Sequence, residues 1–183
     1  MLVQKTNILS PTLLQTINDC MTKNSDFKWS LVNNTAGDEY SIDEAPSFSH
    51  LIFSKGQPVS PFWDLFTGVI LPIVDASEMP FQQLRRVKIG LITKRDKKVE
   101  QGAHVDYHEP HKTILFYFHD SDGDTIFYKE KFDPLKSQPK KFTKEKTITP
   151  KANTLIGFDG WQYHSSSSPV KNGHRIVMNI NFV

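Results

Sequence analysis

Residues 174–182 read HRIVMNINF, and this stretch gives the clearest secondary-structure signal in the chain. Its side chains alternate with a period of two, which predicts an extended strand with two different faces. One face is apolar and carries Ile176, Met178, Ile180 and Phe182, and the other carries Arg175, Val177, Asn179 and Asn181. A buried guanidinium is costly without a partner, so Arg175 on the interior face calls for an anion that can pair with it.

Four shorter runs upstream also have strand character, because they alternate or are rich in β-branched and aromatic residues. They are residues 87–91, 112–119, 125–128 and 153–158. The first third of the chain carries helical signals instead. Ser10-Pro11 and Ser60-Pro61 are each typical of a helix start, and each precedes apolar residues at helical spacing. Pro72 is expected to end or kink the second helix.

This order of elements predicts a mainly β (α+β) fold. Two short helices followed by many strands favour an antiparallel sandwich or barrel, with the helices packed on one sheet. A length of 183 residues fits a single domain spanning 1–183, and 38% hydrophobic with 23% charged residues is close to the globular average.

Composition also excludes several classes of protein. The single cysteine, Cys20, rules out an intrachain disulfide and a cysteine-rich zinc site. A net charge of +2 does not favour a nucleic-acid partner. The longest apolar stretch, residues 69–74, is too short for a membrane span, and the first residues, MLVQKTNILSPTLLQ, lack the pattern of a signal peptide. We therefore expect a soluble, cytoplasmic protein without a membrane partner.

The chemistry is concentrated in three places. In His104-Val105-Asp106 the imidazole and the carboxylate are two residues apart, so on a strand they project from the same face. His164 follows 60 positions after His104, and Arg175 follows 11 positions after His164. Two histidines and one carboxylate form the facial triad of non-heme Fe(II) oxygenases, which leaves three coordination positions open.

Five segments, in this order, match a known family. They are GAHVDY (102–107), TILFYF (113–118), DGDTIFY (122–128), PKANTLIGF (150–158) and QYHSSSSPVKNGHRIVMNINF (162–182). The sequence thus resembles the 2-oxoglutarate/Fe(II)-dependent dioxygenases, in the branch similar to prolyl 4-hydroxylases, over about residues 84–183. The resemblance implies a double-stranded β-helix, or jelly roll, with 84–183 as its core and 1–83 as a helical and strand support. Small phage-encoded members look similar, which would place the protein in a host cytoplasm.

The resemblance also implies roles for individual residues. His104, Asp106 and His164 would ligate Fe(II), and Arg175 would pair with the distal carboxylate of 2-oxoglutarate. Tyr117 would hydrogen-bond the same carboxylate. The implied reaction uses O₂, hydroxylates a substrate and releases succinate and CO₂, and the carboxylate of Asp106 favours hydroxylation over halogenation.

Two further residues are assigned to the co-substrate pocket. Thr113 shares a strand face with Tyr117, and Asn179, but not Asn181, is expected to line the pocket near Arg175. The family branch often carries a tyrosine about ten residues before the His-x-Asp, where this chain has TKRDKK (93–98). This stretch therefore has no tyrosine to make the second contact with the co-substrate.

The sequence does not identify the substrate. A prolyl residue of a protein is the class that the family implies, and a free amino acid, a nucleobase or another small molecule are alternatives. Residues 129–146 hold seven lysines against three acidic residues. This stretch is either a solvated excursion or an electropositive lip for an acidic substrate. Trp161, Tyr163 and the serines at 165–168 either wall the substrate pocket or serve packing and a turn.

Rival interpretations of the same residues remain. The chain could be a non-catalytic jelly-roll or cupin-like module that binds a metal for structure or serves interactions. His104 and His108 have the spacing of a helical zinc pair, but Pro110 argues against a helix. The DSDGD stretch (120–124) is interpreted as a hairpin turn in preference to a Ca²⁺ loop. His50, His119 and His174 are interpreted as structural or surface residues.

Overall fold

The computed structural model describes residues 2–32 and 47–183, and its elements are mostly β-strands. In chain order they are β1 (Leu2–Thr6), α1 (Pro11–Lys23), β2 (Ser30–Val32), β3 (Ser47–Ser54), β4 (Gln57–Pro58), α2 (Trp63–Ser77), β5 (Leu84–Thr93), β6 (Lys112–Tyr117), β7 (Thr125–Lys131), β8 (Lys144–Ile148), β9 (Thr154–Asp159), β10 (Gln162–Ser166) and β11 (His174–Phe182). The prediction of a mainly β fold with two helices is confirmed.

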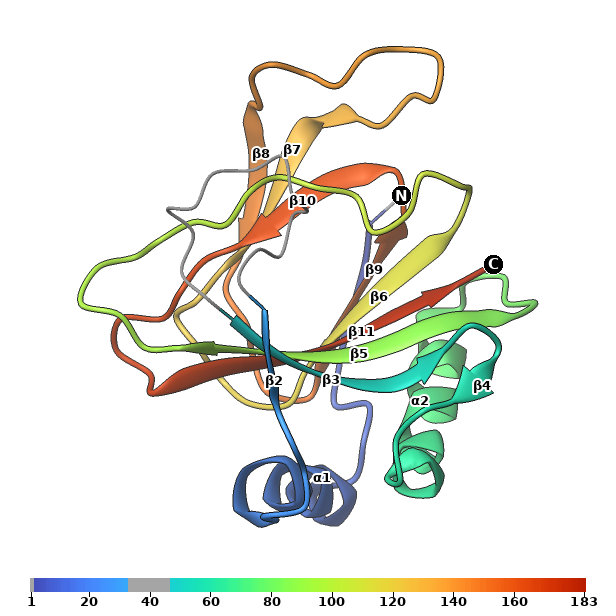
Figure 1. Ribbon diagram of the computed structural model, residues 1–183, viewed down its shortest axis with the longest axis vertical. Helices are drawn as coiled ribbons and strands as arrows, with labels where there is room; N and C mark the ends of the chain where they lie inside the picture. The colour runs from blue at the N-terminus through green and yellow to red at the C-terminus, as the bar shows by residue number, and fades with distance from the viewer. Residues whose placement is uncertain (1, 33–46) are drawn as a thin grey trace.

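The strands form two antiparallel sheets. The larger sheet has the order β1-β9-β6-β11-β5-β3-β2, with β4 paired to β3, and the smaller has the order β10-β7-β8. In Figure 1 the smaller sheet stands on one side of the larger sheet and both helices lie on its other side. The strand at 174–182 runs through the middle of the larger sheet, between β5 and β6.

The two faces of β11 enter different clusters, as its alternation predicts. Ile176, Met178 and Ile180 belong to the main apolar core, which α1 and α2 share. Val177 belongs to a second cluster that joins the larger sheet to Phe127 of β7. Arg175, Asn179 and Asn181 lie on the same face as Val177 and are also buried. The space between the two sheets therefore receives the polar side chains of this strand.

Both helices begin near the predicted positions. Ser10 caps α1, accepting a hydrogen bond from the Leu13 amide at 3.3 Å, and Pro11 is its first residue. The second helix starts at Trp63 and continues through Pro72 to Ser77. Pro72 therefore does not end it, and the alternative expectation, a kink at Pro72, stays a prediction. Pro72 removes one backbone donor, whose acceptor in a regular helix is the Gly68 carbonyl. Both residues are exposed, so water can donate to that carbonyl.

The strands expected within residues 1–83 were not located from the sequence. β1 pairs with β9 at one edge of the larger sheet, and β3 pairs with β5 towards the other edge. The division of the chain into 1–83 and 84–183 stays a prediction, although these strands complete the same sheet as the later ones. Within the described ranges, neither helix combines the length and apolar character needed to cross a bilayer.

The DSDGD stretch is not a hairpin turn. β6 before it belongs to the larger sheet and β7 after it belongs to the smaller one, so the turn carries the chain from one sheet to the other. The pattern correctly predicts a turn, but local chemistry does not distinguish a hairpin from a crossing between layers. The partner strands that decide this are β9, β10 and β11, which lie far along the chain.

Candidate metal centre

His104 and His164 are held against each other by backbone pairing. Each donates its amide hydrogen to the carbonyl of the other, at 2.9 and 3.0 Å, in an isolated antiparallel bridge. Their ring centroids lie 4.7 Å apart. Asp106 lies in a bend and not in a strand, so the strand geometry assumed for the His-x-Asp segment is wrong. The predicted convergence nevertheless occurs, since the bridge and the bend bring all three side chains together.

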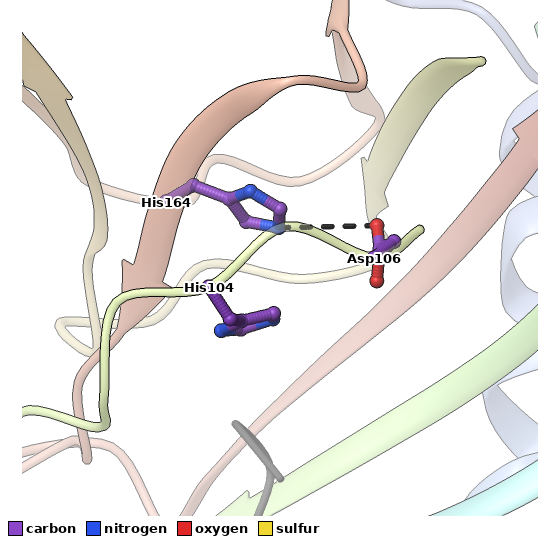
Figure 2. Close-up of side chains that lie close together, drawn as sticks. All are labelled: His104, Asp106 and His164. Atoms are coloured by element: carbon purple, nitrogen blue, oxygen red, sulfur yellow. Dashed lines mark ion pairs between the residues drawn. The ribbon is translucent and has the colours of Figure 1, made fainter. Parts of the chain in front are cut away.

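The three side chains form one cluster, drawn in Figure 2. One ligating atom from each of His104, Asp106 and His164 lies within 4.8 Å of the others. His164 Nε2 lies 3.9 Å from Asp106 Oδ2. Among the described residues this is the single group of three or more such side chains, and neither His108 nor His111 joins it. Residues 104–108 are not helical, so the helical zinc pair that the His104–His108 spacing suggested does not form.

The hydrogen bonds of the two imidazoles select their tautomers. His104 Nδ1 lies 3.0 Å from the Gly102 carbonyl, and His164 Nδ1 lies 3.1 Å from the Gln162 carbonyl. A carbonyl oxygen can only accept, so each Nδ1 must carry the hydrogen and each Nε2 keeps a free lone pair. Metal-ligating histidines are commonly oriented in this way.

Asp106 is held by donors on several strands. Arg86 Nη2 donates to Oδ1 at 2.6 Å, and Asn181 Nδ2 donates to Oδ2 at 2.9 Å. Asn179 Nδ2 contacts both oxygens, at 3.2 and 3.0 Å, and the Thr113 hydroxyl donates at 3.4 Å. Thr113 and Asn179 thus contact the Asp106 carboxylate, and their expected role in binding the co-substrate stays a prediction.

Two residues of this network, Asn181 and Arg86, were not predicted from the sequence. Asn181 was not expected to line the interior, but it is fully buried and bonded to Asp106, Thr113 and Arg86. Arg86 is not among the residues predicted to form the site. The sequence pattern could have indicated it, because Arg86 and Lys88 alternate with Val87 and Ile89 and therefore lie on the interior face of β5.

The shifted pKa values of His104, His164 and Asp106 favour the protonation states that can ligate a metal ion. Burial, followed by the charge of His164, lowers the pKa of His104 to about 4, and burial also lowers the pKa of His164. Burial opposes ionisation of Asp106, but Arg86 and then the two histidines outweigh it and hold the pKa of this carboxyl well below its usual range. Near neutral pH the cluster therefore presents two neutral imidazoles and one carboxylate.

Arg175 lies deep between the sheets, with 3% of its surface exposed. Its Nε donates to the Gly123 carbonyl at 3.0 Å, and its Nη2 donates to the Thr125 hydroxyl at 2.7 Å. Tyr117 donates to the same hydroxyl at 2.7 Å, and its ring centroid lies 5.8 Å from the guanidinium carbon. Burial lowers the pKa of Arg175. Among the described residues, no carboxylate forms an ion pair with this guanidinium.

One pocket connects these groups. His104, His164, Asn179 and Arg175 all line it, and Lys88 lines it from β5. Tyr117 is not among its lining residues, and the Tyr117 hydroxyl donates to Thr125, which does line the pocket. Ser165 and Ser166 line the pocket, whereas Trp161 and Tyr163 line a separate hollow with residues 131–134 and 136–139.

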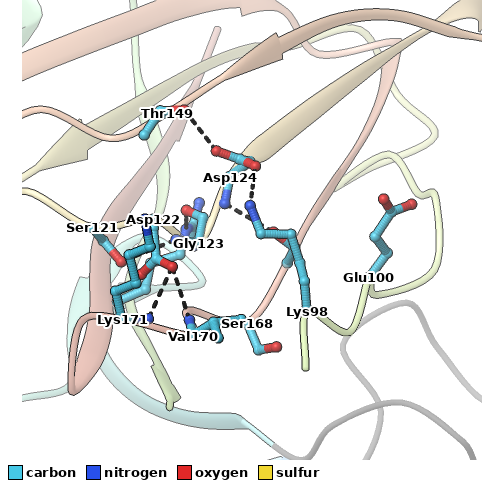
Figure 3. Close-up of polar contacts among 12 residues, drawn as sticks. Lys98, Glu100, Ser121, Asp122, Gly123, Asp124, Thr149, Ser168, Val170 and Lys171 are labelled. Carbon is cyan, nitrogen blue, oxygen red and sulfur yellow. Dashed lines mark hydrogen bonds and ion pairs between the residues drawn. The ribbon is translucent and has the colours of Figure 1, made fainter. Parts of the chain in front are cut away.

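The DSDGD turn contacts Arg175 through the Gly123 carbonyl, which accepts the hydrogen bond from Arg175 Nε. Figure 3 shows the polar contacts of this turn. Asp122 accepts hydrogen bonds from the amides of Val170, Lys171 and Asn172, each at 3.0 Å. Burial would raise the pKa of Asp122, but these backbone donors lower it to about 2. Asp124 pairs with Lys98 at 2.6 Å. These two carboxylates thus already accept hydrogen bonds from groups of the protein, which argues against the interpretation of the DSDGD stretch as a Ca²⁺-binding loop.

The remaining histidines have structural contacts. His50 bonds to the Lys28 carbonyl and to the Ser60 hydroxyl, each at 2.7 Å. The rings of His119 and His174 lie 4.7 Å apart, edge to face. His108 is exposed and stacks on Phe132 at 4.5 Å.

Comparison with known proteins adds information about the fold. No protein-family model matches the sequence, and no curated protein matches it. Several solved structures are similar. An oxidoreductase of the 2OG-Fe(II) oxygenase family from Burkholderia pseudomallei has a TM-score of 0.69 at 15% identity, covering 99% of this chain and 84% of that one.

Two prolyl hydroxylases are also similar. The prolyl-4-hydroxylase of Pseudomonas putida has a TM-score of 0.61 at 10% identity, covering 99% of this chain and 91% of that one. The viral collagen prolyl hydroxylase of Paramecium Bursaria Chlorella virus-1, solved as a 2OG complex, has a TM-score of 0.54 at 14% identity, covering 100% and 96%. The chain therefore has the fold of the 2-oxoglutarate/Fe(II)-dependent oxygenases, as the sequence resemblance predicted.

Proposed function

We propose that this protein is an Fe(II)- and 2-oxoglutarate-dependent oxygenase that hydroxylates its substrate and releases succinate and CO₂. One observation carries the proposal. Two imidazoles with free Nε2 lone pairs and one carboxylate converge at a pocket that also contains a buried arginine. That arginine has no carboxylate partner among the described residues, which fits a site for an acidic ligand and does not fit a purely structural interior.

The donor set suits Fe(II). His104 and His164 would ligate through Nε2 and Asp106 through a carboxylate oxygen, in the arrangement of the facial triad. When bound, the Fe(II) would activate O₂ as the oxidant, and 2-oxoglutarate would supply two electrons as it is converted to succinate and CO₂. The contribution of the chain is to hold the donors rigidly, since Asp106 receives hydrogen bonds from β5, β6 and β11. Arg86 also offsets the charge of this carboxylate.

Arg175 would hold the distal carboxylate of 2-oxoglutarate. Its Nε and one Nη2 hydrogen are used by Gly123 and Thr125, which leaves other N–H groups for a ligand. Tyr117 would act through Thr125, by fixing the hydroxyl that orients the guanidinium. Thr113 and Asn179 would orient Asp106.

The substrate is proposed only as a class. The similar structures include prolyl hydroxylases, one of them in complex with a hypoxia inducible factor peptide fragment, and also the carbocyclase SnoK and the epimerase SnoN. A prolyl residue in a protein is one substrate consistent with this group. Hydroxylation is the outcome we infer from Asp106, and a cytoplasmic location is the expectation from composition.

The test is an anaerobic titration of the metal-free protein with Fe(II) and then 2-oxoglutarate, recorded as a visible spectrum. We expect a weak charge-transfer band from the bidentate chelate. The band should be absent in His104→Ala and should require far more 2-oxoglutarate in Arg175→Ala. Fe(II) bound without any band in the wild type would overturn the proposal and favour a structural or cupin-like metal site.

A further inference from the structure

The pocket contains a second cation that the proposed function does not use. Lys88 lies on β5 directly opposite Asn179 of β11, and both side chains line the pocket with His104 and His164. Lys88 is partly buried, yet its ammonium makes no hydrogen bond or ion pair with any residue in the described part of the chain. A partly buried ammonium without a partner is unfavourable, so its presence calls for an anionic ligand.

The charge of Lys88 remains after the co-substrate is accounted for. Arg86 already offsets Asp106 through the 2.6 Å ion pair. In the proposed enzyme, the two negative charges of 2-oxoglutarate are met by Arg175 and by the metal. None of the described residues that line the pocket is acidic. With the metal and 2-oxoglutarate bound, the positive charge of Lys88 and part of the positive charge of the metal would therefore remain without a neutralising partner.

The position of Lys88 separates it from the co-substrate arginine. Arg175 is paired with Ile92 of β5, four residues after Lys88. Four residues correspond to about 13 Å along a strand. Lys88 instead lies near the Asp106 end of the pocket, because its partner on β11, Asn179, donates hydrogen bonds to Asp106. An anionic group bound there would lie beside the metal, where an oxidisable substrate must be placed.

We propose that Lys88 binds a carboxylate of the primary substrate, so that the enzyme acts on an acid and not on a neutral peptide segment. The inference rests on the proposed function, because it assigns Arg175 and the metal to the co-substrate. Lys88 is then a specificity-determining residue, since a neutral analogue of the substrate would leave its ammonium unpaired.

The test uses the full chain loaded with Zn(II), which suits these ligands without redox chemistry, and with saturating 2-oxoglutarate. Acetate and its neutral isostere acetamide are titrated by calorimetry into the wild type, Lys88→Met, Lys88→Arg and Lys151→Met. Lys151 is the matched control, because it is an exposed lysine paired with Asp120 outside the pocket. A parallel titration measures 2-oxoglutarate binding to Zn(II)-loaded wild type, Lys88→Met and Arg175→Met.

We expect the wild type to bind acetate saturably in the range of about 1–10 mM and not to bind acetamide. Lys88→Met should lose about ten-fold or more in acetate affinity, while Lys88→Arg and Lys151→Met stay within about three-fold. The 2-oxoglutarate affinity of Lys88→Met should match the wild type. Lys88→Met should also be at least as stable as the wild type without ligands, since it removes an unpaired charge.

Three results would overturn the inference. They are no saturable acetate binding by the wild type, equal acetate binding by Lys88→Met, and a loss of 2-oxoglutarate affinity in Lys88→Met as large as that in Arg175→Met. The last result would make Lys88 a co-substrate contact. Failure of the wild type to bind 2-oxoglutarate would reject the proposed function separately, and the acetate titration with Zn(II) alone would still test Lys88.

Discussion

Gly123→Ala is expected to damage both the stability of the protein and the site of Arg175. A Cβ on Gly123 would lie 2.6 Å from the Ser167 carbonyl oxygen and 3.0 Å from both the Pro169 nitrogen and Arg175 Cδ. Two of these atoms belong to the backbone, so the turn itself must move. Overpacking of this kind costs about 1–3 kcal/mol in the free energy of unfolding.

The same shift should weaken co-substrate binding. The Gly123 carbonyl accepts the 3.0 Å hydrogen bond from Arg175 Nε, so a displaced turn releases one of the contacts that orient the guanidinium. We expect the affinity for 2-oxoglutarate, in the presence of Zn(II), to fall about ten-fold, which corresponds to about 1.4 kcal/mol.

The assay is urea unfolding of the metal-free protein, together with calorimetric titration of 2-oxoglutarate. Gly173→Ala is the matched control, because nothing lies within 4 Å of the Cβ that it would add. The control should stay within about 0.5 kcal/mol of the wild type. If Gly123→Ala is as stable as Gly173→Ala and binds 2-oxoglutarate as tightly as the wild type, the reasoning about this turn is refuted.

Three further predictions follow from the polar contacts. The pKa of His104 is lowered from 6.5 to about 4, so the unfolded chain takes up this proton first, and the free energy of unfolding should fall as the pH drops from 6.5 towards 4. Urea unfolding at pH 5, 6 and 7 should show a smaller fall in the free energy of unfolding for His104→Gln than for the wild type. An equal fall would contradict the assignment. Asn181→Ala removes three hydrogen bonds around Asp106 and should lower the free energy of unfolding in urea by about 2 kcal/mol. It should also weaken the Zn(II) affinity measured by chelator competition. Unchanged metal affinity would contradict the role of Asn181 in orienting Asp106. Ser10→Ala removes the cap of α1 and should lower the free energy of unfolding by about 1 kcal/mol while leaving Zn(II) affinity unchanged; a change in metal affinity would contradict the separation of α1 from the site.

Local patterns predicted a large part of this protein. The alternation of residues 174–182 predicted the two faces of β11, because the period of two is a property of the extended backbone itself. Ser10-Pro11 likewise predicted the start of α1, since capping involves only neighbouring residues. The histidines at 104 and 164 and the carboxylate at 106 were identified from residue types and from the resemblance, and the structure brings them together.

Other features depended on the solvent and on neighbouring layers. Pro72 did not end α2, because its position on the exposed face lets water replace a lost hydrogen bond. The DSDGD turn crosses between sheets because β6 and β7 have different pairing partners. Neither outcome can be predicted from the local residues, since each depends on what lies beside them in space.

Residue order alone was enough to predict the strand periodicity, the helix starts and the residue types of the candidate metal ligands. The way in which these side chains are held and charged depends on the tertiary structure. Asp106 is paired with Arg86, 20 positions before it, and with Asn181, 75 positions after it. Lys88 and Asn179 face one pocket because β5 and β11 are adjacent. Backbone periodicity is a local property of the chain, whereas the pairing of strands brings distant side chains into contact.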